Sequence, residues 1–155
     1  MITITKAQLN DLKEILQIQY ASYQSEALLH NDFTIQPLTQ TLDQVIEEYH
    51  KGVILKAEQD DKIIGSVRAY AKEKTVYIGK LMVLPEYQGK GAGKRLLSAI
   101  ENEFPNMRFE LYTAFKSDRN LHLYKTSGYK RFKEETDDAG IRFVYFEKSL
   151  ISPPT

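Results

Sequence analysis

The sequence lacks cysteine altogether, and its opposite charges cancel. Without cysteine, the chain has no disulfide, no thiolate nucleophile, no covalent acyl-cysteine intermediate and no metal site ligated by cysteine sulfur. The 21 basic residues match the 21 acidic ones, so the net charge gives no reason to expect nucleic acid or a membrane surface as a partner. Any basic site must therefore be local.

Long apolar runs are also missing. No stretch approaches the ~18 residues that a membrane-spanning helix needs. The first residues lack the basic segment followed by an apolar one that marks a secretory signal, so we expect a cytoplasmic protein. The three histidines, His30, His50 and His122, are far apart and match no metal-binding spacing, so we expect no metal.

A length of 155 residues suits one domain with one substantial core. No internal repeat, linker or low-complexity segment divides the chain. We therefore expect a single domain over residues 1–150 and a C-terminal tail over residues 151–155.

Apolar periodicity predicts the element order β-α-α-β-β-β-α-β-α-β-β. This order indicates an α/β domain whose sheet mixes antiparallel hairpins with parallel strands joined by crossover helices. Residues 24–40 show a weaker pattern and include Pro37, so we interpret them as a flexible or functional connection. The predicted strands cover residues 1–5, 53–57, 63–70, 75–84, 107–114, 129–135 and 141–150. The predicted helices cover about 5–23, 42–52 and 120–127, and a further helix carries Leu96, Leu97 and Ile100 and ends before Pro105.

A glycine-rich loop, from Gln88 to Gly93, lies between the strand 75–84 and an amphipathic helix. Glycines let a diphosphate approach backbone N–H groups closely, and the first turn of a helix offers free N–H donors and about half a positive charge. Lys90, Lys94 and Arg95 add charge for phosphates. The spacing therefore predicts a phosphate-binding loop.

Two familiar phosphate loops do not fit this segment. A P-loop needs glycine five positions before Gly93 and serine or threonine after Lys94, but those positions hold Gln88 and Arg95. A dinucleotide fingerprint counted from Gly89 needs glycine where Lys94 stands. The remaining alternative is a tight strand-to-helix turn without a ligand.

The spacing Gln-x-x-Gly-x-Gly, formed by Gln88, Gly91 and Gly93, resembles the acetyl-CoA signature of the GNAT family of N-acetyltransferases. The resemblance implies a GNAT-like mixed, mostly antiparallel central sheet flanked by helices, with acetyl-CoA as cosubstrate. In that family the loop holds the pyrophosphate, and the preceding strand pairs with the pantetheine arm. The cofactor-binding residues implied here are Leu81, Met82, Val83, Gln88, Gly89, Lys90, Gly91, Ala92, Gly93 and Lys94.

Gly79 lies inside the same strand. A glycine there often marks a bulge, which would separate this strand from the next and open a slot for an extended cofactor. A packing glycine beneath a neighbouring side chain is the alternative.

A second segment, from Ser117 to Tyr129, resembles a later element of the same family, a short helix ending in Leu-Tyr-x-x-x-Gly-Tyr. The resemblance nominates Tyr124 as the acid that protonates the leaving thiolate. A phenol pKa of about 10 exceeds a thiol pKa of about 8.5, so the phenol can donate at neutral pH; a core tyrosine is the alternative. Many members carry asparagine at the position of Ser117. Here Asn120 shares a helix face with Tyr124, so it is a candidate for the cofactor contact that asparagine makes in those members. The alternative is that Asn120 is only the N-cap of the helix.

Amide formation needs a neutral amine, a stabilised oxyanion and a protonated leaving group. Without cysteine, we expect the acceptor to attack acetyl-CoA directly in a ternary complex. We expect a backbone N–H near Val83 to donate a hydrogen bond to the oxyanion. Glu26 is the first choice for the general base, because it lies near the segment that shapes the acceptor site in this family. Glu110 is the alternative if the strand register turns it toward the slot.

The resemblance therefore implies an acyltransferase, and we expect the primary amine of a small molecule as its acceptor. A second hypothesis is a protein acetyltransferase acting on a lysine or an N-terminus, with a groove between residues 24–40 and the hairpin 135–141. A third is a non-catalytic acyl-CoA-binding sensor. The sequence leaves the acceptor's identity and homo-oligomer formation open.

Overall fold

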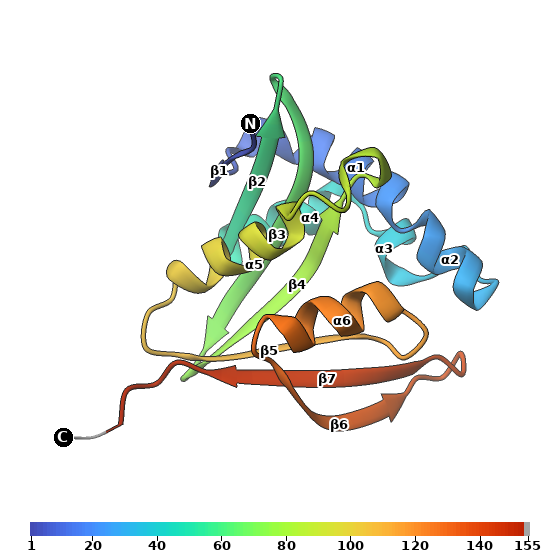
Figure 1. Ribbon diagram of the computed structural model, residues 1–155. Coiled ribbons are helices and arrows are strands. Elements are labelled where there is room, and N and C mark those ends of the chain that lie inside the picture. Colours follow the sequence, from blue (N-terminus) through green and yellow to red (C-terminus); the bar gives the residue numbers. More distant parts are fainter. Residues whose placement is uncertain (154–155) are drawn as a thin grey trace.

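A seven-stranded mixed sheet forms the centre of the computed structural model, which describes residues 1–153 (Figure 1). Its strands are β1 (Thr3–Lys6), β2 (Val53–Gln59), β3 (Lys62–Lys72), β4 (Thr75–Val83), β5 (Arg108–Ala114), β6 (Lys130–Thr136) and β7 (Arg142–Ser149). They lie in the order β1-β2-β3-β4-β5-β7-β6, and only the central β4–β5 pair is parallel. The expected mostly antiparallel sheet is confirmed. The end of the predicted tail, residues 154 and 155, lies outside the described residues.

Helices cover both faces of this sheet (Figure 1). They are α1 (Leu12–Ser22), α2 (Gln24–His30), α3 (Gln36–Thr39), α4 (Leu42–Lys51), α5 (Ala92–Asn102) and α6 (Asp118–Thr126), with single 3-10 turns η1 (Leu9–Asp11) and η2 (Pro85–Tyr87). In the view of Figure 1, α5 and α6 lie in front of the sheet, and α4 lies behind it. In the part of the chain that the structure describes, no helix has the length and apolar character needed to cross a membrane.

The connection 24–40 contains two short helices, α2 and α3, that the apolar pattern did not indicate. The pattern is weak because only Ala27 of α2 is buried, and no residue of α3 is. Polar contacts from α1 fix the segment instead: the Gln19 side chain donates to the Pro37 carbonyl at 2.8 Å, and the Tyr20 hydroxyl donates to the Gln40 carbonyl. The interpretation of this segment as flexible is therefore wrong, since it is an ordered wall.

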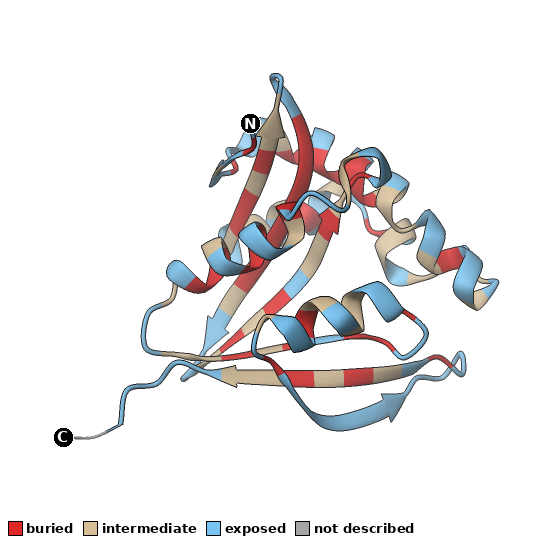
Figure 2. Ribbon diagram, viewed as in Figure 1, coloured by how far each residue is buried: buried red, intermediate tan, exposed pale blue. Residues whose placement is uncertain are grey.

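Two apolar clusters hold the layers together (Figure 2). The larger one packs α5 and α6 onto the sheet around Leu96, Ile100, Phe109 and Phe146, all at most 1% exposed. The smaller one packs α1 and α4 onto the opposite face. By contrast, every residue of the edge strand β6 is exposed. The buried faces fix the positions of β4 and of the helices beside it.

The pairing between β4 and β5 stops after three residues. The two strands pair at Thr75, Val76 and Tyr77, and no pairing follows along the rest of β4 in the described structure. On the other side of β4, Val67 of β3 faces both Lys80 and Leu81, because the register shifts there. The extra residue is a β-bulge, which bends the strand and increases its twist. The two central strands therefore diverge (Figure 1).

Gly79 immediately precedes this bulge, as predicted. A Cβ atom built at Gly79 would meet no atom within 4 Å, so the alternative of a packing glycine is wrong. The strained residue is its neighbour Lys80, whose φ of 51° lies in the left-handed region. A non-glycine residue in this conformation is uncommon and costs about 1 kcal/mol or more, so the bend has an energetic cost that the surrounding packing offsets.

Leu96→Ala tests the larger apolar cluster. Leu96 is fully buried between α5 and the sheet, so its truncation should lower the free energy of unfolding by about 2–5 kcal/mol, measured by urea denaturation. Leu28→Ala is the matched control, because Leu28 is 70% exposed; it should change stability by less than about 0.5 kcal/mol. Equal effects of the two substitutions would contradict the described packing.

Candidate active site

The divergence of β4 and β5 leaves a cleft beside the loop that follows β4. A cavity of about 400 Å³ occupies the loop side of this cleft. Its walls include nearly all of the predicted cofactor-binding residues, namely Leu81, Met82, Val83, Gln88, Gly89, Gly91, Ala92, Gly93, Lys94 and Asn120. Lys90 is the exception: it is exposed and does not line the cavity, and its ammonium lies 5.7 Å from the centre of the Tyr87 ring. The fold thus brings together residues as far apart in the chain as Leu81 and Asn120.

The edge of β4 offers backbone groups to this cavity. The Leu84 N–H donates to the Ile64 carbonyl of β3 at 2.8 Å. In an antiparallel pair alternate residues point their N–H and C=O groups outward, so the neighbouring Val83 directs both away from β3. The Gln88 side chain donates to the Val83 carbonyl at 2.9 Å, which leaves the Val83 N–H facing the cleft. Gln88 therefore fixes the loop to the strand.

The glycine loop has the properties of an anion site. Gly89 and Gly91 have φ angles of 79° and 82°, and a Cβ atom on either would meet no protein atom within 4 Å. The space that a side chain would fill is thus left open beside the first turn of α5, whose N-cap is Gly91. No side chain caps this turn, and no acidic residue lies in it, so its N–H donors are free for an anion. These residues fit the pyrophosphate of acetyl-CoA.

One face of α6 completes this cavity, and the sequence interpretation missed it. Arg119, His122, Leu123 and Thr126 all line the cavity. Their spacing of three and four residues is the signal that places them on one helix face. Gly93 of α5 lies against this face, since a Cβ atom built on it would be 3.5 Å from the Leu123 side chain, an ordinary contact distance. Arg119 adds a positive charge to the lining of the loop-side cavity.

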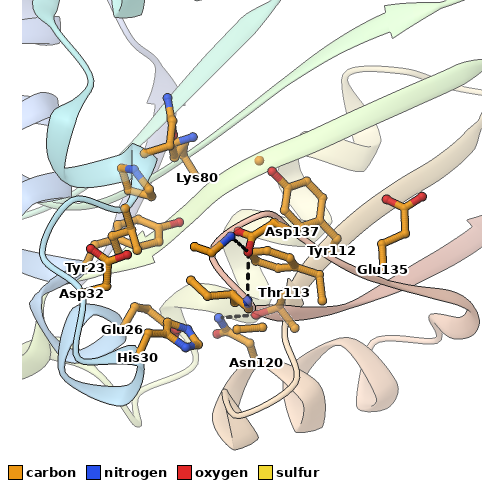
Figure 3. Close-up of a pocket in the computed structure, with 18 of the residues that line it drawn as sticks. Tyr23, Glu26, His30, Asp32, Lys80, Tyr112, Thr113, Asn120, Glu135 and Asp137 are labelled. Atoms are coloured by element: carbon orange, nitrogen blue, oxygen red, sulfur yellow. Dashed lines mark hydrogen bonds and ion pairs between the residues drawn. The ribbon is translucent and has the colours of Figure 1, made fainter.

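A larger cavity, of about 740 Å³, lies on the opposite side of the cleft (Figure 3). One wall is the segment 23–37, and the facing wall is the hairpin turn between β6 and β7. The predicted groove between these two segments is therefore present. The sequence interpretation did not assign most of its polar residues, because they come together only in the folded chain: Tyr23, His30, Asp32, Lys80, Tyr112, Thr113, Glu135 and Asp137.

The two cavities meet at four residues, which line both of them: Tyr23, Glu26, Leu81 and Asn120. The end of α1, the first turn of α2, the bulge of β4 and the first turns of α6 each supply one of them. A group held in the loop-side cavity and a group held in the larger cavity can approach each other only here. This junction is where a transfer reaction between two bound molecules would take place.

Tyr124 lies beside this junction. It lines the larger cavity and is 5% exposed, and its ring packs edge-on against Phe146 at 5.6 Å between centroids. Burial raises the pKa of the Tyr124 phenol, with smaller contributions from Tyr23 and Glu26. Within residues 1–153 its hydroxyl makes no hydrogen bond. The phenol is therefore a protonated donor that remains free for a ligand.

Asn120 and Ser117 have different positions. Ser117, not Asn120, is the N-cap residue of α6, so the N-cap alternative for Asn120 is wrong. Asn120 lies one turn before Tyr124, donates to the Thr113 hydroxyl at 3.2 Å and lines both cavities. Ser117 lines neither and donates to Glu26 at 2.8 Å. Asn120 is thus the better placed of the two for a cofactor contact.

The two candidate bases, Glu26 on α2 and Glu110 on β5, have different surroundings. Glu26 lies at the junction, where Oε1 accepts the Ser117 hydrogen bond and Oε2 is 3.8 Å from His30 Nε2. Glu110 instead pairs with Arg108 at 2.9 Å and does not line either of the two cavities that meet at the junction. Its neighbour Leu111 is buried in the larger apolar cluster. Because the register of β5 turns Glu110 away from the junction, Glu26 is the better placed base.

Comparisons with known proteins agree with this geometry. A family model described as an acetyltransferase (GNAT) domain matches residues 19–150. The chain is 26% identical to an S-alkylcysteine N-acetyltransferase of Bacillus subtilis, over 94% of this chain and 87% of that protein.

Solved structures share the fold. The ribosomal-protein-S18-alanine N-acetyltransferase of Escherichia coli aligns with a TM-score of 0.82 at 13% identity, over 99% of this chain and 97% of that one. The PaiA N-acetyltransferase of Thermoplasma acidophilum, in complex with coenzyme A, aligns with a TM-score of 0.77 at 19% identity, over 96% and 99%. At these identities the likeness is one of architecture.

Gly91→Glu tests the loop as the phosphate site. The new side chain would fill the space beside the first turn of α5 with negative charge, so acetyl-CoA affinity measured by calorimetry should fall by roughly 100-fold or more. Gly140→Glu is the matched control, because Gly140 also has a positive φ, of 85°, and open space around its Cβ, but does not line the loop-side cavity. Equal affinities of the two variants would refute the assignment.

Proposed function

The chain belongs to the GNAT family of acetyltransferases, and from this premise we propose that it transfers the acetyl group of acetyl-CoA to the primary amine of a small molecule. Membership of the family makes it an acyltransferase. The observation that carries the proposal is the meeting of the two cavities at Tyr23, Glu26, Leu81 and Asn120. We assign the loop-side cavity to acetyl-CoA and the larger one to the acceptor.

Acetyl-CoA is held by backbone groups in this proposal. The free N–H groups at the start of α5 bind the pyrophosphate, and Lys94 and Arg119 balance its charge. The pantetheine arm extends along β4 in place of a pairing strand, next to Val83. This arrangement directs the thioester toward Leu81 at the junction.

The reaction is a direct aminolysis of the thioester. The amine nitrogen attacks the carbonyl carbon and forms the C–N bond, the oxyanion is held by a β4 N–H, and the C–S bond then breaks. Tyr124 donates its proton to the departing sulfur, and burial keeps the phenol protonated until that step. The chain has no cysteine to carry the acetyl group, so both substrates are bound together.

Glu26 removes a proton from the amine. An alkyl ammonium has a pKa of about 10.4, so at neutral pH it must lose a proton before it can attack. Glu26 is the carboxylate at the junction, and the hydrogen bond from Ser117 orients it. A carboxylate at this place would also attract the protonated amine before the transfer.

A small acceptor suits the larger cavity, which is walled by the segment 23–37 and the β6–β7 turn. The Bacillus subtilis relative is named for a small amino-acid substrate. The alternative, a peptide acceptor, is favoured by the exposed apolar residues Leu28 and Phe33 beside the same wall. Thiol release from acetyl-CoA across a panel of small amines and peptides separates the two. Turnover of small amines supports the proposal, and turnover of peptides alone would replace it.

Tyr124→Phe tests the acid. Removing the hydroxyl while keeping the ring should lower kcat by roughly 10- to 10⁴-fold and leave acetyl-CoA affinity unchanged. Tyr129→Phe is the control, because Tyr129 is also buried beside Tyr124 but its hydroxyl donates to Glu101 away from both cavities. Unchanged turnover of the Tyr124 variant would remove this residue from the mechanism.

Glu26→Gln tests the base through its pH profile. At pH 7 the variant should lose about 10²- to 10⁴-fold in kcat/KM, and the deficit should shrink as the pH rises toward the amine pKa, where the free amine no longer needs a base. Glutamine keeps an oxygen for the Ser117 hydrogen bond, and Glu14→Gln on the exposed face of α1 is the control. A deficit that does not change with pH would show that Glu26 only positions its neighbours.

A further inference from the structure

Lys80 is the single lysine or arginine that lines the acceptor cavity within residues 1–153. It also lines a neighbouring cavity of about 410 Å³, and the two cavities share Ile78, Gly79, Lys80, Tyr112 and Tyr145. The acceptor cavity therefore continues past Lys80 into a second compartment. The β4 bulge places Lys80 at this passage in a left-handed conformation.

The Lys80 ammonium has no partner within residues 1–153. No carboxylate lies within ion-pair distance of Nζ, and Nζ donates no hydrogen bond to a protein group. Burial, together with the nearby Arg68, lowers the pKa of Lys80 to about 8, so the group is still largely protonated at pH 7. A partly buried cation without a counter-ion is costly, and an anionic ligand would offset that cost.

The groups behind Lys80 add to the positive charge. Arg68 is 3% exposed; its Nη2 donates to Gln19 at 2.6 Å and to Gln40 at 2.8 Å, while its Nη1 has no partner in the described structure. Glu48 is the one carboxylate beside it, 2.8 Å from Arg68 Nε, and it also accepts from the Gln40 side chain. Lys80 and Arg68 thus carry two positive charges near Glu48, which already pairs with Arg68, and these three side chains keep a net positive charge.

Carboxylates line the same acceptor cavity as Lys80. Glu26, Asp32 and Asp137 line it, and Figure 3 shows Glu26 and Lys80 on either side of the Tyr23 ring. A ligand with a positive and a negative group therefore finds a carboxylate and an ammonium within one cavity. Lys80 directly precedes Leu81, which lies at the junction of the two cavities. An anionic group bound by Lys80 would thus lie close to an amine held at the junction.

From these contacts we propose that Lys80, backed by Arg68, binds the carboxylate of the acceptor, and that the acceptor is an amino acid or an amino-acid derivative with a free α-amine. The inference rests on the proposed acetyl transfer and deepens it by naming the acceptor class. A single unpaired ammonium matches one carboxylate better than a doubly charged phosphate. The second compartment then receives the side chain of the acceptor; its lining includes Tyr70, Tyr77, Tyr112 and Tyr145 and also the charged residues Glu48, Lys51, Arg68 and Glu110.

The experiment compares amino acids with the amines that lack their carboxylate. Suitable pairs are S-methyl-L-cysteine with 2-(methylthio)ethylamine, L-methionine with 3-(methylthio)propylamine, and L-phenylalanine with phenethylamine. Thiol release from acetyl-CoA gives kcat/KM for each member. For at least one pair, the unmodified protein should prefer the amino acid by about 10- to 100-fold, the value of one charge-assisted hydrogen bond.

Three variants assign this preference to Lys80. Lys80→Gln should bring the ratio close to one by lowering kcat/KM for the amino acid only, and Lys80→Arg should retain part of the preference. Lys72→Gln, at the exposed end of β3, should leave the ratio unchanged. Because the ratio is taken within one protein sample, partial loss of folded protein does not affect it, and acetyl-CoA affinity confirms that the variant is folded.

The outcomes separate the two levels of the proposal. Turnover of amines with no preference for the amino acid, or a preference that survives in Lys80→Gln, would overturn the carboxylate site and leave the acetyl transfer standing. If none of the amines causes thiol release from acetyl-CoA, the proposed function is overturned, and the carboxylate site with it.

Discussion

The interruption of hydrogen bonding between β4 and β5 is the constraint on which the rest of the structure depends. The strands pair only as far as Tyr77, and the bulge at Lys80 and Leu81 then bends β4 away from its neighbour. An unpaired strand edge in the middle of a sheet is normally costly, because its N–H and C=O groups lose their partners. A ligand that runs along the edge can restore them, and this is why we propose that an extended molecule binds at the defect in the sheet.

Helices turn this cleft into two compartments. α5 begins at Gly91 and gives the loop side free N–H donors, while α6 presents Asn120 to both compartments and the Tyr124 phenol to the larger one. The ordered segment 23–37 encloses the other side with acidic groups. The compartments join at Tyr23, Glu26, Leu81 and Asn120, of which Leu81 belongs to the bulge. In the proposed function, one local irregularity of β4 thus determines where the acetyl donor and the acceptor meet and, through Lys80, supplies a charge for the acceptor.

Much of this was accessible from the sequence where the signal is local. The strand-to-loop-to-helix pattern around Gly91 and the helix carrying Tyr124 depend on spacing within a few residues, and the structure places both beside the cleft. The helices α2 and α3 were missed because they carry no apolar stripe: only Ala27 of α2 is buried and no residue of α3 is, and α3 is held by the hydrogen bond from Gln19 to the Pro37 carbonyl. Lys80 was missed for a related reason: its significance depends on the buried Arg68, which lies on another strand.

A crystal structure with coenzyme A tests the central claim most directly. The account predicts that the pyrophosphate contacts the N–H groups from Gly89 to Lys94, that the pantetheine arm takes the place of a pairing strand along β4 at Val83, and that the sulfur lies within hydrogen-bond distance of the Tyr124 hydroxyl. Coenzyme A bound with its pantetheine outside the β4–β5 cleft, or with its sulfur remote from the junction at Leu81, would contradict it.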